Sequence, residues 1–460
     1  MIVCKFGGSS LASAEQIKRA TAIMLDDPDR RIMVVSAPGK RKDVIPDQKI
    51  TDLLLDLIQH QESIGGGQKE RDVFVQRIVE IATGLELTPE VAQSLSFELD
   101  QAIAKLDPNE PSSRADVLAM GEIASAKLVT RYLTAIGVQA RYVDPREAGL
   151  LLSYRNGVTD ILPETYDNLA PLALEEAITV FPGFFGRTKE GDTITFSRGG
   201  SDISGAVLAA AVNASLYENW TDRDSVQAVN PELVTDAVAL DEMSYREMRE
   251  LAYIGFSIIH PEALEPVIRK NIPLRIANTD APHLPGTRIV AERTHIDRIL
   301  TGIAASDHFC SINLRRILIN QEIGILAKIL TIFSELGINV HHVPTGIDSV
   351  SVIVKEAYFP LEQELVLRHR LAAELELTQV TVVRQMSIVM LVGEGMRDTT
   401  GVMARASAAL AKEKISIEVA MLDYFEISML FMMRQYEKLR AVSVLYNEFF
   451  LRVKDEDPFE

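Results

Sequence analysis

MIVCKFGGSS, residues 1–10, joins a short apolar run to a pair of glycines, and an amphipathic helical pattern follows at once. Ser13 is suited to cap that helix, with Gln16 three residues later, and apolar side chains recur on one face. A buried strand that passes through glycines into a helix is typical of proteins built from alternating strands and helices. The opening residues therefore predict an α/β fold.

The first two thirds of the chain continue this alternation. Strand-like apolar runs are expected at residues 32–35, 179–181 and 216–220, and residues 65–107 are expected to be mainly helical. Residues 189–192 predict a hairpin turn. Strands separated by helices tend to pair in parallel and to be covered on both faces. We therefore expect a three-layer α/β/α sandwich around a mainly parallel sheet.

The composition limits the class of protein. A chain of 460 residues is too long for one compact core and predicts two or three domains. Its net charge of -18 argues against nucleic acid or an anionic membrane as a partner, because both require a basic face. Cys4 and Cys310 fit a reducing compartment and give neither a disulfide framework nor a zinc site. With no signal-peptide pattern and no apolar run of membrane-spanning length, a cytoplasmic protein is expected.

An internal repeat occupies the last third of the chain. Helical patterns begin after Gly324 and Gly401, 77 residues apart (401 − 324 = 77), and Ile338 and Ile415 recur at the same offset. Each copy has the order strand, helix, strand, strand. This order predicts two small α+β modules, each with helices over an antiparallel sheet. The alternative is a chance similarity between two amphipathic helices.

A break rich in proline and glycine at residues 279–287 separates the α/β region from the repeat. It predicts a domain boundary just after this segment. We expect a first domain at residues 1–290, a first module at 300–384 and a second module at 385–455.

The first candidate site is Lys5 with Gly7, Gly8 and Ser9, at the end of the first strand. Glycines let the backbone approach a phosphate closely, and the N-terminus of the following helix offers N–H donors and the positive end of its dipole. Lys5 adds a full positive charge there. The spacing differs from that of a P-loop, and a glycine pair after a strand can also be only a tight turn.

The second candidate site is the segment 196–202, which carries Arg198 and two glycines before another helix. Ser201 or Asp202 would cap that helix, and Arg198 offers a planar fork suited to a carboxylate or a phosphate. Taken alone, Asp202 can be a plain cap and Arg198 a solvated loop residue. Two glycine-rich loops with cations at strand-to-helix junctions of one sheet nevertheless indicate a shared ligand crevice.

Other positions carry less information. Thr221 and Asp222 follow a predicted strand and form a third candidate loop, although this pair is also common in turns. Thr51 and Glu122 belong to no motif that spacing alone defines, and both are expected in helices or at their starts. The eight histidines show no metal-ligand spacing, so no metal site built from protein residues is predicted.

Together these motifs resemble the aspartokinases of the amino-acid kinase family, over nearly the whole chain. The resemblance is carried by KFGGSSL (5–11), VSAPGKR (35–41), TDLL (51–54), FPGFFG (181–186), TFSRGGSDIS (195–204), ENWTD (218–222), YREMRELAY (245–253) and GFSIIHP (255–261). The first and fifth of these segments are together highly specific. The repeat is similar to the paired, ferredoxin-like ACT domains of these enzymes. VPTGIDSVS (343–351) is similar to a segment of one monofunctional branch.

The resemblance implies a role for each matching residue. Lys5 and Asp202 would be catalytic, with Asp202 orienting Lys5 or the metal–phosphate cluster. Arg198 would hold the α-carboxylate of the substrate, and Glu122 would face its α-ammonium group. The implied binding residues are Lys5, Gly7, Gly8, Ser9, Thr221 and Asp222 for ATP, and Thr51, Glu122, Phe184, Arg198 and Ser201 for aspartate.

The implied reaction is the MgATP-dependent phosphorylation of the aspartate side chain to 4-phospho-L-aspartate, the first step of lysine, threonine and methionine biosynthesis. A side chain with a pKa of about 3.9 is already an anion at neutral pH and needs no general base. Positioning and charge neutralisation by Lys5, Mg²⁺ and backbone N–H groups would therefore supply the catalysis. The resemblance also implies lysine or threonine, or both, as effectors. A homodimer or larger homo-oligomer would form through the ACT domains.

Several positions depart from the family pattern. Gln227, Glu232 and Ser257 stand where many relatives carry Tyr, Arg and Lys near the nucleotide. These departures leave open a catalytically weakened, amino-acid-binding regulator of the same fold. In the second repeat, Tyr424 and Phe425 replace small polar residues, so altered feedback control is expected. Only a short acidic tail follows this repeat, so no dehydrogenase domain is expected.

Overall fold

The computed structural model describes residues 1–41, 44–64, 66–155, 158–196, 199–256, 259, 261–422 and 427–451. The chain forms two compact units. Unit 1 comprises residues 1–226, 240–246 and 257–293, and unit 2 comprises residues 227–239, 247–256 and 294–460. The chain therefore passes between the units several times before the proline-rich segment. Helix α9 (Tyr245–Tyr253) has its first two residues in unit 1 and the others in unit 2.

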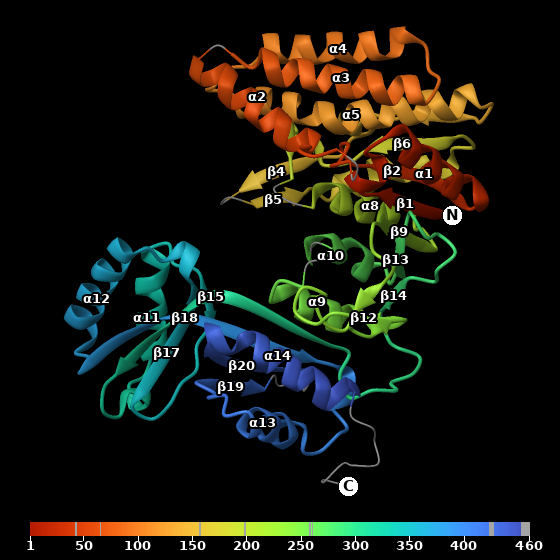
Figure 1. Cartoon of the computed structure of the whole chain (residues 1–460). Helices are drawn as coiled ribbons and strands as arrows, with labels where there is room; N and C mark the ends of the chain where they lie inside the picture. The colour runs from red at the N-terminus through yellow and green to blue at the C-terminus, as the bar shows by residue number, and fades with distance from the viewer. Residues whose placement is uncertain are drawn as a thin grey trace. The chain divides into compact units, whose positions relative to one another are not determined.

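The core of unit 1 is an eight-stranded sheet with the order β12-β14-β13-β9-β1-β2-β6-β3 (Figure 1). Its strands are β1 (Ile2–Phe6), β2 (Arg30–Val35), β3 (Ala140–Tyr142), β6 (Ile178–Pro182), β9 (Leu216–Thr221), β12 (Glu242–Ser244), β13 (Leu274–Asn278) and β14 (Thr287–Val290). Neighbouring strands pair in parallel, except for the antiparallel pair β13 and β14. The predicted, mainly parallel sheet is confirmed.

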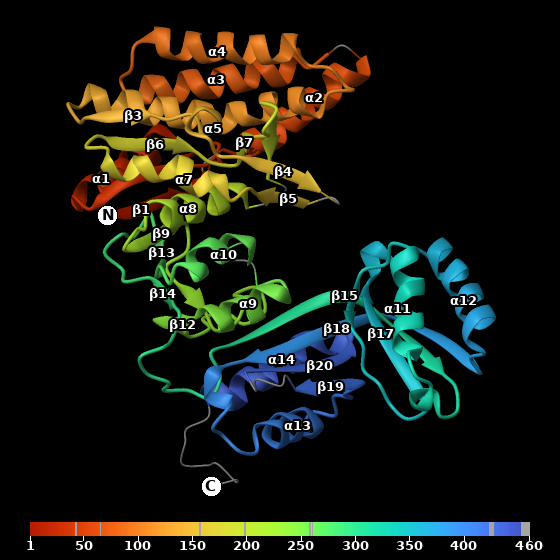
Figure 2. The same cartoon turned by 180° about the vertical axis from the view of Figure 1, so that it is seen from behind.

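Helices cover both faces of this sheet (Figures 1 and 2). One face carries α1 (Ala14–Asp26) and α5 (Pro111–Ala135), with an outer layer formed by α2 (Ile50–Ile64), α3 (Gln68–Gly84) and α4 (Pro89–Ala104). The other face carries α8 (Gly200–Ala211), against which α7 (Glu164–Leu169) and α10 (Pro261–Arg269) pack. Helix α5 is buried on most sides because it lies between the sheet and the outer layer.

The shorter elements of unit 1 include two antiparallel ribbons. Strands β4 (Leu152–Arg155) and β5 (Val158–Ile161) form one ribbon, and the short helix α6 (Pro145–Ala148) precedes it. Strands β7 (Phe185–Arg187) and β8 (Thr193–Thr195) form the other, which confirms the hairpin predicted at residues 189–192. Strands β10 (Val226–Gln227) and β11 (Ala239–Leu240) form a separate two-stranded sheet, and each has one residue in unit 1 and one in unit 2.

The predicted N-caps of two helices can be compared with the structure. Ser13 caps α1 as predicted, and its Oγ accepts a hydrogen bond from the N–H of Gln16 at 3.4 Å. The prediction that Ser201 or Asp202 caps the next glycine-flanked helix is wrong. Gly199, with φ of 62°, is the N-cap of α8, and both predicted caps lie inside the first turn. A left-handed residue at this position suits glycine, and it leaves the Asp202 side chain available for a distant partner.

A buried charge cluster ties the central strands together. Glu218 on β9 is 1% exposed and accepts hydrogen bonds from Arg30 Nε at 2.8 Å, Arg275 Nη1 at 3.0 Å and Trp220 Nε1 at 3.0 Å. Both guanidinium groups also lie over the Trp220 ring, 5.4 Å from its centroid. Cys4 adds a weak S–H hydrogen bond to the same carboxylate, and burial raises the pKa of its thiol. Buried charges are tolerated when they are paired and hydrogen-bonded in this way.

Unit 2 contains a six-stranded sheet in which every pair is antiparallel, with the order β16-β17-β15-β18-β20-β19 (Figure 2). Its strands are β15 (Gly302–Arg315), β16 (Val340–His342), β17 (Ser349–Lys355), β18 (Gln379–Val392), β19 (Val419–Leu422) and β20 (Ser428–Arg434). Its helices are α11 (Ile325–Glu335), α12 (Leu361–Leu375), α13 (Val402–Lys412) and α14 (Lys438–Tyr446).

The predicted repeat is confirmed, and its two copies share this one sheet. Strands β15 and β18 start 77 residues apart (379 − 302 = 77), and so do helices α11 and α13 (402 − 325 = 77). The two central strands pair with Gly302 opposite Val392 at one end and Arg315 opposite Gln379 at the other. This register relates the copies by an approximate two-fold axis between the strands. Each copy keeps a separate apolar core.

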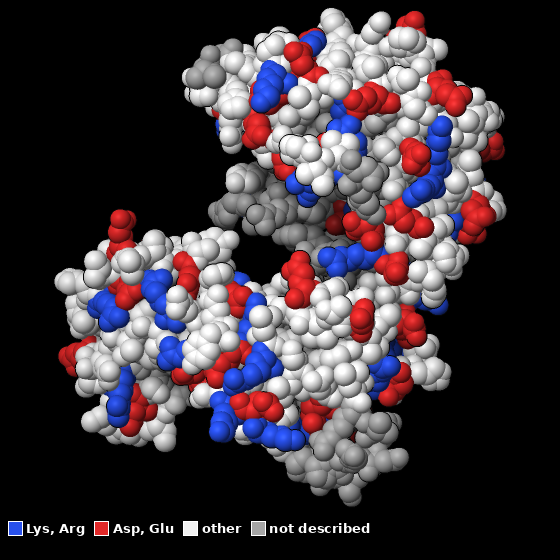
Figure 3. All heavy atoms as spheres, in the orientation of Figure 1, with Lys and Arg blue, Asp and Glu red and all other residues white. Residues whose placement is uncertain are grey.

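The helices and the charged surface bear on whether the chain could meet a membrane. In the described part of the chain, no helix has both the length and the apolar character needed to cross a bilayer. On the face drawn in Figure 3, acidic and basic side chains are interspersed over the described surface.

Replacing the buried carboxylate at the centre of the sheet should destabilise unit 1 strongly. Glu218→Gln leaves Arg30 and Arg275 without their buried counter-charge, so we expect the free energy of unfolding to fall by about 3–5 kcal/mol. Trp220 is the only tryptophan of the chain, and its fluorescence in urea reports this region. Glu265→Gln removes an exposed ion pair with Arg269 and should change the value by less than about 0.5 kcal/mol. Equal midpoints for Glu218→Gln and the parent would contradict this account.

Candidate functional site

The end of strand β1 and the first turn of α8 are joined by an ion pair at the carboxyl end of the parallel strands. Lys5 Nζ lies 2.6 Å from Asp202 Oδ1, and Asn219 Nδ2 donates a hydrogen bond to the same oxygen at 2.8 Å. Asn219 lies directly opposite Lys5 in the pairing of β1 with β9. Lys5 is only 8% exposed, and an ammonium has three donors. The arrangement holds a cation in place and leaves it donors for an anion.

The glycines of the first loop permit a backbone approach that no side chain would allow. A Cβ on Gly8 would lie 2.8 Å from the carbonyl oxygen of Ala37, and a Cβ on Gly39 would lie 2.6 Å from the carbonyl carbon of Gly8. Gly39 N–H donates to Gly8 O at 2.8 Å, and Gly7 N–H donates to Trp220 O at 3.0 Å. A 3₁₀ turn, η1 (Gly8–Leu11), begins here, and the first N–H groups of such a turn lack partners within it. A Cβ on Gly7 would lie 3.7 Å from Lys5 Nζ, so the Lys5 charge is next to a turn whose backbone donors suit a phosphate.

The turn before β7 is packed against the start of α8. A Cβ on Gly183 would lie 2.7 Å from the Cα of Ser201, which is 8% exposed. Phe184 has φ of 77°, and its N–H donates to Ser204 Oγ at 3.1 Å. A positive φ at a bulky residue costs free energy and is held only when its surroundings enforce it. The structure thus packs the turn that carries Phe184 against the first turn of α8, which carries Ser201, and both are predicted substrate residues.

Glu122 lies in the middle of α5, is 4% exposed and faces the loop after β2. Its carboxyl accepts a backbone hydrogen bond from Ala37, whereas its Oε2 is buried without a partner among the described residues. Burial raises the pKa of Glu122 to about 8, and the N–H group of Ala37 opposes this effect. A desolvated acid with an unused acceptor is suited to receive a positively charged ligand group.

The remaining predicted residues border this region. Thr51 is the second residue of α2 and is half-buried. Thr221 ends β9 and its hydroxyl donates to Asp222 Oδ1 at 3.2 Å. Thr279 N–H donates to Thr221 O at 2.9 Å, and the Thr279 and Ser10 hydroxyls lie 2.7 Å apart. The loop of Thr221 and Asp222 is therefore connected to the glycine turn through Thr279 and Ser10.

Some predicted positions cannot be placed in the site. Arg198 and Ser257 lie outside the described residues. Gln227 and Glu232 belong to unit 2. Sequence reasoning missed Asn219 as a site residue, although a polar side chain within the apolar strand LYENWT is a usable signal. Such a residue must find a hydrogen-bond partner, and here the partner is Asp202.

Two protein-family models match parts of this chain. Residues 1–278 match the amino acid kinase family, and residues 389–449 match an ACT domain. Aspartokinase 3 of Bacillus subtilis is 40% identical over 454 residues, which cover 98% of this chain and 99% of that protein.

Two solved structures of aspartate kinases resemble this chain over nearly its whole length. Clostridium acetobutylicum aspartate kinase superposes with a TM-score of 0.85 at 30% identity, over 98% of this chain and 100% of that one. E. coli aspartokinase III in complex with aspartate and ADP superposes with a TM-score of 0.78 at 24% identity, over 98% and 100% of the two chains, and supports the fold alone.

The raised pKa of Glu122 predicts that the ligand-free protein loses stability as the pH rises. In an unfolded chain a glutamate titrates at about pH 4.3, whereas folded Glu122 keeps its proton up to about pH 8. The folded state binds more protons between these values, so stability falls across this window and levels off above it. Glu122→Gln mimics the neutral acid. It should raise the urea midpoint of Trp220 fluorescence at pH 8 and leave it nearly unchanged at pH 5.

The exposed pair of Glu265 and Arg269 offers the matched control, since Glu265→Gln should shift the midpoint equally little at both pH values. Destabilisation of Glu122→Gln at pH 8, or the same shift at pH 5 and pH 8, would contradict the prediction.

Proposed function

The chain belongs to the amino acid kinase family, and we propose that, as an aspartokinase, it transfers the terminal phosphoryl group of ATP to the side-chain carboxylate of L-aspartate. The product is 4-phospho-L-aspartate, the first intermediate on the way to lysine, threonine and methionine. The observation that carries this proposal is the Lys5–Asp202–Asn219 contact beside the Gly7–Gly8 turn. The family expected from the sequence is confirmed by the full-length match to Aspartokinase 3.

The proposed mechanism depends on charge and position. The attacking carboxylate and the phosphates of ATP are both anionic, so the site must neutralise charge before the two can meet. Lys5, held by Asp202, supplies a fixed ammonium, and the backbone at Gly8 and Ser9 supplies N–H donors. Mg²⁺ bound with the nucleotide would add charge neutralisation, and Asp202 would orient Lys5 or the metal–phosphate cluster. Thr221 and Asp222 would border the nucleotide.

Recognition of aspartate is proposed to rest on Glu122. The substrate ammonium would pair with the buried Oε2, and a cation at that point lowers the pKa of a carboxyl group, so Glu122 would bind aspartate in its ionised form. Thr51, Phe184 and Ser201 would complete the pocket. Arg198 would hold the α-carboxylate, a role that rests on its match to the family motif.

Regulation is proposed to lie in unit 2. The ACT match and the repeated sheet support an amino-acid effector, lysine or threonine or both. Strands β16 and β19 are the edges of the six-stranded sheet, so strand addition is one route to the proposed homo-oligomer. Leu422, the last described residue before the altered segment, is 51% exposed at the end of β19, and Tyr424 and Phe425 lie outside the described residues.

A hydroxamate assay with L-aspartate and MgATP tests the catalytic proposal. The parent should form aspartyl hydroxamate. Lys5→Ala should lower kcat by about 10²-fold or more, because it removes the fixed charge at the phosphoryl group. Lys18→Ala, which removes an exposed lysine 3.9 Å from Glu86, should match the parent.

Folding of each variant is checked by Trp220 fluorescence. A folded Lys5→Ala variant with turnover near that of the parent would refute the assigned role. A parent that binds aspartate and forms no hydroxamate would favour the non-catalytic regulator.

A further inference from the structure

The loop between β2 and α2, residues 36–49, connects three parts of the proposed site. Gly39 N–H donates to Gly8 O at 2.8 Å, next to the phosphate turn. Ala37 provides the backbone hydrogen bond to Glu122. The other end of the loop leads into the first turn of α2, where Ile50 N–H donates to Pro38 O at 3.1 Å. The position of this loop therefore sets the distance between the phosphate side and the amino-acid side.

Apolar packing contributes little at Val44 and Ile45, in the second half of this loop. The side chains of Val44 and Ile45 are exposed, Ile45 to 93%. A cavity of about 610 Å³ lies beside the loop, and Ser9, Arg41, Val44 and Arg77 are among the residues that line it. A loop with exposed apolar tips and open space beside it needs polar contacts to keep one conformation.

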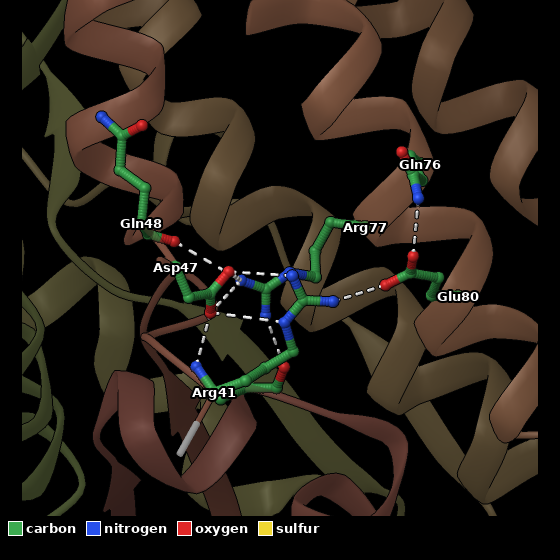
Figure 4. Close-up of polar contacts among 7 residues, drawn as sticks. Arg41, Asp47, Gln48, Gln76, Arg77 and Glu80 are labelled. Atoms are coloured by element: carbon green, nitrogen blue, oxygen red, sulfur yellow. Dashed lines mark hydrogen bonds and ion pairs between the residues drawn. The ribbon is translucent and has the colours of Figure 1, made fainter. Parts of the chain in front are cut away.

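Arg77 from α3 provides those contacts (Figure 4). It is 4% exposed, and its Nη2 donates to the two carboxylate oxygens of Asp47 at 2.9 and 2.7 Å. Its Nη1 donates to the carbonyl oxygen of Ala12 at 2.9 Å, directly after the η1 turn. Arg41 completes the cluster, with its backbone N–H at 2.6 Å and its Nη2 at 2.8 Å from the Asp47 carboxylate. One guanidinium thus bridges the phosphate turn and the loop.

The ionisation of Asp47 supports a stable contact between Asp47 and the two arginines. Burial opposes the ionisation of Asp47, but the hydrogen bonds from Arg41 and the charge of Arg77 outweigh it and lower its pKa to about 2. Asp47 is therefore charged throughout the neutral range. A lysine at position 77 would keep the charge but could not reach both Ala12 and Asp47 with a rigid planar fork.

We infer that Arg77 is a positioning residue, which acts through Asp47 to hold the phosphate turn and the 36–49 loop at the spacing that phosphoryl transfer to aspartate requires. The inference rests on the proposed function. It gives a role to a costly buried arginine that is not among the residues proposed to bind aspartate or ATP. Reacting groups must be held within narrow limits, since a displacement of about 1 Å can cost about 10²-fold in rate.

The test combines steady-state kinetics with L-aspartate and MgATP and the dissociation constant of ADP. We expect Arg77→Met and Asp47→Asn each to lower kcat at least about tenfold while the ADP dissociation constant stays within about threefold of the parent value. Arg77→Lys should recover part of the loss. Arg71→Met is the matched control, because Arg71 also lies on α3 but pairs with Asp100 on α4, and its kcat should stay within about twofold.

A double mutant separates positioning from general destabilisation. If Arg77 acts through Asp47, then Arg77→Met combined with Asp47→Asn should lower kcat no more than about twofold below the worse single variant. Fully additive losses, or a folded Arg77→Met enzyme with kcat near the parent value, would overturn the inference.

Asp47→Asn decides the question if Arg77→Met does not fold, since Asn keeps the shape of the side chain and removes its charge. A kcat within about twofold of the parent would then refute the positioning role. An inactive parent would instead refute the proposed function, so the two failures are distinguishable.

Discussion

The ion pair between Lys5 and Asp202 is the contact on which the rest of the site depends. Lys5 comes from β1 and Asp202 from α8, and Asn219 on β9 fixes the shared carboxylate oxygen. A buried ammonium is stable only with a counter-charge, so the two glycine-rich loops must meet wherever this pair forms. Gly8 allows the first loop to approach the backbone of Ala37 and Gly39, and Gly183 allows the turn before β7 to approach Ser201 at the start of α8. The Lys5–Asp202 pair and the closely packed glycine turns therefore lie together at the carboxyl end of the parallel strands.

Two charged or ionisable side chains of the site face different ligand groups. The Lys5 ammonium is paired with Asp202, whereas burial raises the pKa of Glu122 to about 8 and keeps its carboxyl neutral until a cation arrives. A ligand that brings an ammonium to Glu122 and an anionic group to Lys5 satisfies both. The loop after β2 lies between these poles, touching Gly8 through Gly39 and Glu122 through Ala37. The contact of this loop with Arg77 therefore helps to hold Lys5 and Glu122 at a fixed separation.

Much of this could be predicted from the sequence, and the failures have physical causes. Alternating apolar runs predicted the parallel sheet, and a constant offset of 77 residues predicted the repeat, because both are local or periodic signals. The predicted N-cap of α8 was wrong because the helix begins earlier, after Gly199. The Asp202 side chain instead forms a long-range ion pair with Lys5. Arg77 and Asn219 were missed because periodicity shows that a side chain is buried and does not show which distant residue it meets. For the same reason, periodicity does not show that residues 227–239 and 247–256, which interrupt the sequence of unit 1, belong to unit 2.

The most direct test is a crystal structure of the protein with ADP and L-aspartate bound. We expect the β-phosphate beside the Gly7–Gly8 turn and the aspartate side-chain carboxylate facing Lys5. The α-ammonium should lie within about 3 Å of a Glu122 oxygen, the distance of a charge-assisted hydrogen bond. Aspartate or ADP bound in a cavity away from Lys5, or a Glu122 carboxyl that touches neither ligand, would contradict this arrangement.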